Sequence, residues 1–250
     1  MGNTEKEAKP KKKKSIISTI VLIIAIIVFV GSGIMLIKIF TEYKGAVDEY
    51  KELEKQYVTT DEEGLPDVDL AALKELNSDV IGWIRFENIN IDYPIVIGKD
   101  NDYYLHHTFK KESNSSGAIF MDYRNNPNFE DQNSVIYGHN MKNKSMFALL
   151  NEYKSEEYFK ENPGFYIIDD TGSHYYKIYS CYACNVIEQE DHYTIKFGND
   201  KKFQQYIDKI KKCSKYDTGV TPTVDDKLVM LSTCMGDDDY RFVVHAVKVS

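Results

Sequence analysis

The sequence predicts a mainly β fold, a closed or nearly closed β-barrel with helical insertions, preceded by one membrane-spanning helix. Three observations support this prediction. Residues 15–37 contain no charged side chain, short apolar and β-branched runs alternate with polar turns from Trp83 onward, and an amphipathic helical segment interrupts these runs at Asp200–Lys212. Many short strands with two or three helical insertions are typical of a barrel, in which strand edges are paired.

The first element is the apolar segment at residues 15–37. Its length exceeds the roughly 20 residues that a helix needs to cross a bilayer. Lys9 and Lys11–Lys14 precede this segment, whereas only Lys38 follows it closely. Because positive charge collects on the cytoplasmic side of membrane segments, we expect the N-terminus in the cytoplasm and residues 39–250 outside the cell.

A cleaved signal peptide is the alternative for this segment. Gly31-Ser-Gly33 imitates a cleavage site, but apolar residues continue through Phe40, and a signal peptide has a shorter apolar core of roughly 7–15 residues. We therefore predict a basic cytoplasmic tail at 1–14 and an uncleaved transmembrane signal anchor at 15–37.

The charge of the chain divides at this segment. Residues 1–38 hold seven Lys and two Glu, a net charge of +5, and because the whole chain carries −8, residues 39–250 carry −13. Nucleic-acid-binding proteins need basic surfaces, so the sequence argues against a nucleic-acid partner. We expect the negative net charge of residues 39–250 to keep this part of the chain soluble. The alternative is that it attracts a cationic component of the cell wall.

Helical elements are expected at 38–74. Residues 39–58 predict a helix that forms either a stalk or a layer along the following domain, and Asp67 or Asp69 is placed to cap a short helix at Leu70–Leu76. A separate β-rich domain is then expected at 75–250, with Trp83 as a core residue.

The strands of this domain follow from short apolar runs between turn residues. Asp170-Thr-Gly172 predicts a hairpin turn, and Met146–Tyr153 predicts a helical turn. The expected strands are 84–86, 89–97, 117–123, 134–137, 165–169, 174–186, 228–233 and 241–249.

Cys181-Tyr-Ala-Cys184 permits a redox or zinc interpretation. A zinc site needs about four ligands, however, and the sequence offers no second pair. In a regular strand, residues three apart point to opposite faces, so these thiols diverge. We expect both to be small buried side chains, and we expect no metal and no cofactor.

Cys234 ends one β-rich run, and Arg241 begins the next after a short acidic loop. A buried cysteine at the end of a core strand is the simpler interpretation. The alternative is a nucleophile, because an adjacent antiparallel strand can hold a cation near the thiol and favour the thiolate. Alternation places Ser232 on the same face as Cys234, which suggests that the strand emerges into a polar pocket.

His139 is the favoured partner among six histidines, because it follows an apolar run and Gly138 permits close approach. His245 is the competitor. It lies about 13 Å from Arg241 along one strand, at the rise of about 3.3 Å per residue, so it belongs to the middle or far end of that strand.

Four segments together resemble a class B sortase. The resemblance covers roughly residues 75–250, and the helix at Asp200–Lys212 and the N-terminal anchor also match that family. It implies a sortase-type closed β-barrel of about eight strands with N-terminal helices. The segments are Phe120-Met-Asp-Tyr-Arg-Asn125, Tyr137-Gly-His139-Asn-Met, Leu231-Ser-Thr-Cys234 and Arg241-Phe-Val-Val.

The resemblance also implies roles for site residues. Cys234 corresponds to the nucleophile, His139 to the general acid, and Arg241 to the group that orients substrate and stabilises the oxyanion. Tyr137 and Ser232 resemble positions that line the substrate groove. No residue that orients His139 can be named from the sequence.

By this resemblance, the protein is a cysteine transpeptidase. Its substrates are secreted proteins with a C-terminal sorting signal, similar to Asn-Pro-x-Thr-Asn or Pro-x-Thr-Gly. The enzyme cleaves after Thr through a thioacyl-enzyme and transfers the protein to a peptidoglycan precursor or cross-bridge amine. Haem-uptake anchoring, pilus assembly and general anchoring stay open.

Other functions stay open beside this one. A non-catalytic, membrane-anchored binding protein on a sortase-like barrel would not need Cys234, and a cysteine peptidase would use water as acceptor. L,D-transpeptidases also combine Cys and His, but their Ser-x-Gly-Cys context is absent around Cys234. The acidic run Asp237–Asp239 suggests calcium binding, although a solvated acidic loop is the simpler interpretation.

Overall fold

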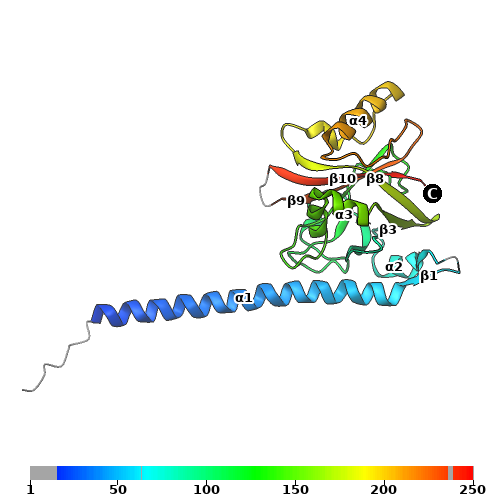
Figure 1. The fold of residues 1–250 in the computed structure, drawn as a ribbon. Helices are drawn as coiled ribbons and strands as arrows, with labels where there is room; N and C mark the ends of the chain where they lie inside the picture. The colour runs from blue at the N-terminus through cyan, green and yellow to red at the C-terminus, as the bar shows by residue number, and fades with distance from the viewer. Residues whose placement is uncertain (1–15, 63, 236–238, 250) are drawn as a thin grey trace, which may run out of the picture. The chain divides into compact units, whose positions relative to one another are not determined.

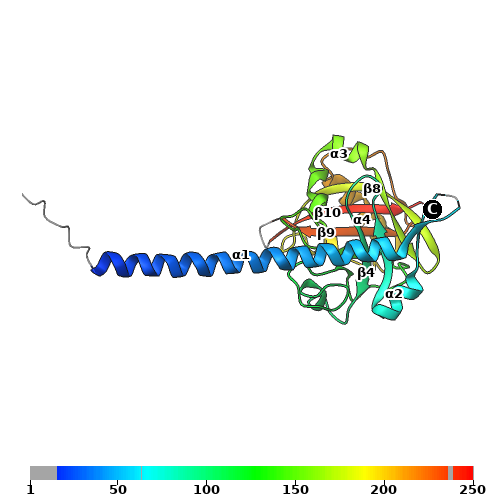
Figure 2. The same ribbon diagram turned by 90° about the horizontal axis from the view of Figure 1, so that it is seen from below.

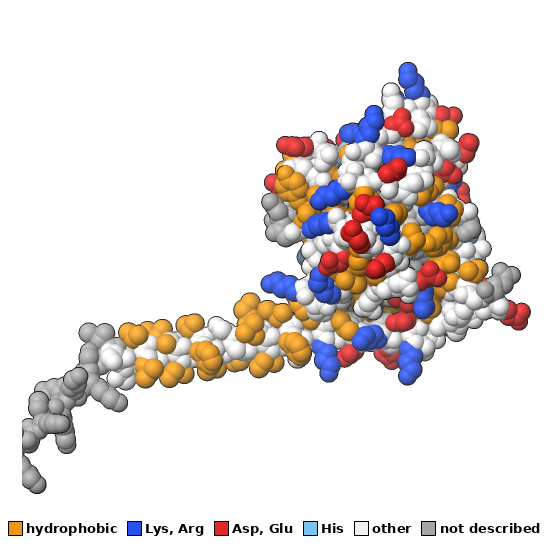
Figure 3. Space-filling model, in the orientation of Figure 1, with side chains coloured by type: hydrophobic (Ala, Val, Ile, Leu, Met, Phe, Trp, Pro, Cys, Tyr) orange, Lys and Arg blue, Asp and Glu red, His pale blue; other side chains and the backbone are white. Residues whose placement is uncertain are grey.

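The computed structural model describes residues 16–62, 64–235 and 239–249. The chain forms two compact units that divide between Glu42 and Tyr43. The first contains the N-terminal part of helix α1 (Ile16–Tyr57), whose side chains from Ile20 to Phe40 are mostly large, hydrophobic and exposed (Figure 3). By length and composition, α1 is apolar enough to cross a membrane.

The second unit is built on a closed barrel, which confirms the predicted fold class (Figures 1 and 2). Within the described residues, eight strands follow one another in the order β10-β8-β7-β3-β4-β5-β6-β9, and β9 pairs with β10 to close the ring. β4 pairs with β5 and β6 with β9 in parallel, and the other neighbours pair antiparallel. The strands are β3 (Val80–Arg85), β4 (Asp92–Ile97), β5 (Ile119–Met121), β6 (Asn133–Tyr137), β7 (Gly164–Asp169), β8 (Gly172–Asn185), β9 (Leu228–Cys234) and β10 (Tyr240–Lys248).

Strand lengths differ from the predicted ones where the backbone turns within an apolar run. β4 begins at Asp92 rather than Ile89, because the amide of Ile91 bonds the carbonyl of Ile89 in a tight turn. β5 is short because Gly117 has a positive φ of 58° before it and Asp122 begins a turn after it. The β7–β8 hairpin has its turn where the sequence predicts it, since Asp169 pairs with Gly172.

The N-terminal elements of the second unit pack on the barrel. Ala46, Tyr50 and Leu53 of α1 are buried in the main core cluster with Trp83, so this part of α1 is a layer along the domain rather than a stalk. A small sheet, β1 (Val58–Thr60) with β2 (Pro66–Val68), leads to α2 (Leu70–Leu76). Asp69 caps α2 by accepting a hydrogen bond from the amide of Ala72 at 2.9 Å, as one of the two expected caps.

A second core cluster lies between α4 (Asp200–Cys213) and the outer face of β8, β9 and β10 (Figure 1). The buried face of α4 consists of Phe203, Tyr206, Ile207 and Ile210, as the helical spacing predicts. The short helices are η1 (Tyr103–Leu105), η2 (Ala148–Lys154), α3 (Glu156–Glu161) and η3 (Glu190–Tyr193).

Candidate active site

Cys234 and Arg241 face each other across two adjacent strands. β9 and β10 pair antiparallel in a register that places Arg241 directly opposite Cys234. Directly opposed side chains leave the sheet on the same face, with Cβ atoms about 5 Å apart. Both side chains are half-buried, and Nη1 of Arg241 donates a hydrogen bond to the carbonyl of Tyr240 at 3.0 Å. A thiol and a fixed guanidinium therefore share one end of the barrel.

His139 arrives at the same end through a parallel pair of strands. β6 and β9 run parallel with Tyr137 opposite Ser232, and the ladder continues where the amide of Gly138 bonds the carbonyl of Ser232 at 3.1 Å. Cys234 follows Ser232 by two residues, as His139 follows Tyr137. Two parallel strands in this register deliver both residues to the same edge of the sheet.

The ring of His139 is oriented by a backbone carbonyl. Its Nε2 lies 2.8 Å from the carbonyl oxygen of Leu105 in η1. A carbonyl only accepts, so Nε2 carries the hydrogen and donates it, and Nδ1 is the ring atom left to gain or lose a proton. This carbonyl is the orienting group that the sequence does not reveal, because a main-chain oxygen has no residue signature.

Two glycines permit this arrangement. A Cβ at Gly117 would lie 2.9 Å from the Leu105 oxygen and 3.1 Å from Cδ2 of His139. A Cβ at Gly138 would lie 2.5 Å from a side-chain carbon of Ile119 and 2.7 Å from the ring of Phe147. Gly138 thus permits the expected close approach, and the groups that approach it are the side chains of Ile119 and Phe147 rather than backbone atoms.

One cavity of about 240 Å³ brings together all five predicted site residues. Cys234, His139 and Arg241 line it with Tyr137 and Ser232, and Ser232 is 2% exposed. A neighbouring cavity of about 750 Å³ is also lined by Tyr137 and Arg241, and it extends along η3 and the chain that follows. The two cavities therefore adjoin at Tyr137 and Arg241.

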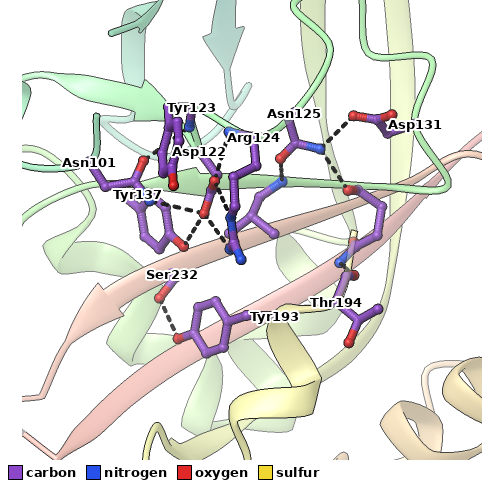
Figure 4. A network of polar contacts seen from close by, with 12 residues as sticks. Asn101, Asp122, Tyr123, Arg124, Asn125, Asp131, Tyr137, Tyr193, Thr194 and Ser232 are labelled. Carbon is purple, nitrogen blue, oxygen red and sulfur yellow. Dashed lines mark hydrogen bonds and ion pairs between the residues drawn. The ribbon is translucent and has the colours of Figure 1, made fainter. Parts of the chain in front are cut away.

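Ser232 and Tyr137 are held by further polar and aromatic contacts. The hydroxyls of Tyr193 and Ser232 hydrogen-bond at 2.9 Å (Figure 4). The rings of Tyr137 and Tyr193 are nearly parallel, with centroids 6.2 Å apart. Burial raises the pKa of Tyr193, and burial together with the charge of Asp122 raises the pKa of Tyr137. Both phenols are therefore neutral hydrogen-bonding groups at neutral pH.

Asp122 is a buried charged residue that contacts Tyr137 (Figure 4). Its Oδ2 accepts hydrogen bonds from the Tyr137 hydroxyl at 2.9 Å and from Nδ2 of Asn101 at 3.0 Å. The guanidinium of Arg124 donates to both oxygens at 2.8 Å. Burial alone raises the pKa of Asp122, but these hydrogen bonds outweigh it, and the pKa of the carboxyl is lowered. Asp122 is therefore ionised at neutral pH.

Sequence reasoning missed several residues of these cavities. Asn101, Leu105 and Phe120 line the smaller cavity, and Tyr193 lines the larger one. Phe120 lies within a segment that carries the family resemblance, which was an available signal. The other three lie in connections or short helices whose path no periodicity predicts.

The remaining histidine and cysteine candidates lie elsewhere. His245 is fully buried under α4, with Nε2 3.2 Å from the Tyr182 hydroxyl, in the middle of β10 as expected. Cys181 and Cys184 are free thiols in different core clusters, and burial raises their pKa values to about 12 and about 11. They are the buried small side chains that the strand period predicts.

Metal binding finds no support in the described part of the chain. No group of three or more His, Cys, Asp or Glu side chains within residues 16–62, 64–235 and 239–249 is arranged to hold a metal ion. The acidic run considered for calcium, Asp237–Asp239, falls largely outside the described residues.

Comparisons with known proteins agree with this geometry. A sequence model described as Sortase domain matches residues 84–249. Sortase B of Listeria monocytogenes is 38% identical over 189 residues, covering 75% of this chain and 75% of that protein.

Solved structures give the same result. Bacillus anthracis sortase B in complex with AAEK1 is 33% identical, with a TM-score of 0.75 over 85% of this chain and 100% of that one. A Staphylococcus aureus sortase B–substrate complex is 26% identical, with a TM-score of 0.74 over 84% of this chain and 99% of that one. With the family match and a thiol, an imidazole and a guanidinium at one barrel end, the chain belongs to the sortase family of cysteine transpeptidases, in class B.

Proposed function

We propose that this sortase cleaves a C-terminal sorting signal, Asn-Pro-x-Thr-Asn-like or Pro-x-Thr-Gly-like, after Thr and transfers the protein to a peptidoglycan amine. The observation that supports the proposal is the strand register. It brings Cys234, His139 and Arg241 from three strand ends to one cavity. A nucleophile, a proton carrier and an oxyanion-stabilising cation are the groups that acyl transfer needs.

The residues divide the chemistry of the first step. The Cys234 thiolate attacks the Thr carbonyl carbon, and the guanidinium of Arg241 stabilises the oxyanion that forms. The peptide C–N bond then breaks, and protonated His139 gives its proton to the leaving amine. Because Leu105 holds Nε2–H, Nδ1 is the atom that transfers the proton. The product is a thioester between Thr and Cys234.

The second step reverses these roles. The acceptor amine attacks the thioester carbonyl and passes a proton to Nδ1 of His139, and the C–S bond breaks to release the Cys234 thiolate. A new amide joins the substrate protein to peptidoglycan. No cofactor takes part in either step.

The adjoining cavities support a peptide substrate. Tyr137 and Arg241 line both the cavity of about 240 Å³ and that of about 750 Å³, and Tyr137 and Ser232 would contact the signal beside Cys234. The S. aureus relative with 26% identity is solved as a substrate complex, which supports a substrate-binding role for these cavities.

The proposal includes a membrane anchor. Residues 15–37 would span the membrane once, with the basic tail 1–14 in the cytoplasm, residues 38–74 as N-terminal helices and residues 75–250 as the extracellular catalytic domain. The apolar, exposed surface of α1 supports the span, and the lysines before it support the orientation.

The experiment uses the full chain in detergent micelles with quenched peptides of both signal types. Triglycine is present or absent, and products are identified by mass spectrometry. We expect a Thr-terminated product joined to triglycine, with no product from Cys234→Ala. Cys213→Ala is the matched control, because Cys213 is another partly exposed free cysteine outside both cavities. Cleavage that triglycine does not alter would indicate a peptidase, and activity in Cys234→Ala would refute the mechanism.

A further inference from the structure

Asp122 lies in the connection between β5 and β6, immediately after β5, and its side chain has no solvent exposure. Its carboxylate is saturated with donors. Oδ1 accepts from the amide and Nε of Arg124, and Oδ2 accepts from an Arg124 guanidinium nitrogen, the Asn101 amide and the Tyr137 hydroxyl. All these contacts lie between 2.8 and 3.0 Å.

The partners of Asp122 come from three segments, and Figure 4 shows them meeting at its carboxylate. Asn101 lies between β4 and η1, in the segment that goes on to Leu105 and its contact with His139. Tyr137 ends β6, two residues before His139. Arg124 lines the larger cavity. One buried carboxylate thus connects two residues that line the cavity of Cys234 with one that lines the adjoining cavity.

The hydrogen bond from Tyr137 limits what this side chain offers to a substrate. A phenol has a single hydrogen, and Tyr137 donates it to Asp122. The Tyr137 oxygen therefore meets any further partner as an acceptor. Asn101 is fixed as well, because its Oδ1 accepts from the amide of Tyr123 at 3.0 Å while its Nδ2 donates to Asp122.

A neighbouring carboxylate serves as a comparison, because it does not contact the side chains around Cys234. Asp131 lies in the same β5–β6 connection and is 7% exposed. It accepts from Nδ2 of Asn125 and the amide of Asn126, and it pairs with Lys196 at 3.3 Å. Asp131 lines neither cavity and contacts neither Asn101 nor Tyr137. It stabilises the connection and pairs with Lys196 of the larger cavity, whereas Asp122 holds Asn101 and Tyr137, which line the cavity that contains Cys234.

We propose that Asp122 is a positioning residue for peptide binding, which fixes Asn101 and presents the Tyr137 oxygen as an acceptor for a hydrogen-bond donor on the bound signal. The inference rests on the proposed function, since it assigns these cavities to the peptide. Asp122 does not touch the reacting atoms. Its loss should therefore weaken peptide binding and leave the thiol chemistry in place.

The test measures kcat and KM of the full chain for a signal peptide that the wild type cleaves. A charged hydrogen bond is worth about a factor of ten or more, so we expect Asp122→Asn to raise KM about 10-fold. The rate at which iodoacetamide alkylates Cys234 should stay within about 2-fold of the wild type, a change of less than 1 kcal/mol in barrier. Asp131 pairs with Lys196, a cavity-lining side chain that is 69% exposed, and exposed ion pairs contribute little, so Asp131→Asn should lower the unfolding midpoint and change KM less than about 2-fold.

A second variant keeps the inference testable if Asp122→Asn does not fold. Tyr137→Phe removes only the hydroxyl, and it should raise KM in the same way. Because the hydrogen bond that Tyr137→Phe removes is one of those that Asp122→Asn disturbs, the double variant should raise KM no further than the larger single effect. A wild-type KM in both single variants, or multiplied effects in the double variant, would overturn the inference.

Failure of the proposed function gives a different pattern. In that case the wild type cleaves no signal peptide, or Cys234→Ala keeps the activity. If the positioning role alone is wrong, Cys234→Ala is inactive while Asp122→Asn shows only a lower unfolding midpoint with wild-type KM.

Discussion

In the proposed mechanism, Arg241 acts on the reacting carbonyl because it lies opposite Cys234. The register of β9 and β10 fixes this place, and the guanidinium is further held by the Tyr240 carbonyl. A planar guanidinium offers parallel donors to an oxyanion, whereas an ammonium is a single point charge. Shape should therefore matter at this position as well as charge.

We predict that Arg241→Lys retains the charge but loses most of the activity. Removing one oxyanion donor lowers kcat about 100-fold or more in well-studied hydrolases, and we expect a similar loss here. The measurement is kcat for the signal peptide with triglycine. Arg85→Lys is the control, because Arg85 lies on β3, pairs with Asp92 and lines neither cavity. Activity within about 3-fold of the wild type in Arg241→Lys would show that charge alone suffices.

Sequence reasoning at this scale finds side chains whose chemistry is unusual for their surroundings. Cys234, His139 and Arg241 are visible because each follows or begins an apolar run. Asn101 is an ordinary polar residue in a polar connection. Asp122 lies in the segment Phe120–Asn125 that carries the family resemblance, but the partners of its carboxylate depend on which segments the fold places side by side. That information lies in long-range pairing and not in local pattern.

At the scale of elements, the segment from η1 to β5 positions the imidazole of His139. Gly117, with φ of 58°, lets this connection turn so that the Leu105 carbonyl reaches His139. A Cβ there would lie 2.6 Å from the Tyr104 oxygen and 2.9 Å from the Leu105 oxygen. Backbone atoms cannot rotate away as side chains do, so the connection itself would have to shift.

We predict that Gly117→Ala lowers kcat/KM at least 10-fold by displacing the Leu105 carbonyl. It should also lower the free energy of unfolding by about 1–2 kcal/mol, because a residue with a Cβ is strained at positive φ. The measurements are steady-state kinetics and urea unfolding.

Gly219→Ala is the matched control for that substitution. Gly219 has a similar φ of 72°, but a Cβ there meets no atom within 4 Å. The control should therefore lose stability through strain and keep its activity. Equal activity in the two variants would contradict the role of the Leu105 contact.

Elements differ in how far the sequence predicts them. α4 is predicted almost to its ends, because its apolar period is a local feature, and the structure adds the cap at Asn199. β4 and β5 are shorter than predicted because their ends are determined by turns and by pairing partners. The closure of the barrel depends on the pairing of β9 with β6 and β10, which no single segment encodes.

At the scale of the whole molecule, the barrel and α4 enclose a polar cluster that resists protonation. The Tyr182 hydroxyl lies 2.8 Å from Nδ1 of His192 and 3.2 Å from Nε2 of His245. Both rings are fully buried in the barrel–α4 interface. Burial lowers the pKa of His245 to about 3, with a smaller contribution from His192, and burial also lowers the pKa of His192. The folded protein therefore holds both histidines neutral.

These shifts give stability a pH dependence with a definite sign. A histidine has a pKa near 6.5 in the unfolded chain, so below about pH 6.5 the unfolded state binds protons that the folded state does not. The free energy of unfolding falls as pH decreases. Asp92 acts in the opposite direction, because burial raises its pKa to about 6 and the folded state keeps its proton at higher pH than the unfolded chain.

At low pH the unfolded wild-type chain binds more protons than the folded protein does. We predict that His245→Gln reduces this excess by about one proton. Between about pH 6.5 and 4.5, the free energy of unfolding of the variant should fall less steeply with decreasing pH than that of the wild type. The two slopes should differ by at most about 1.4 kcal/mol per pH unit, the value for one proton. Urea unfolding at several pH values measures the slope, and subtracting the two curves cancels Asp92 and the other groups that do not interact with His245. His106→Gln, at a side chain that is 65% exposed, is the control substitution. Parallel curves for His245→Gln and the wild type would mean that His245 does not contribute to the loss of stability at low pH.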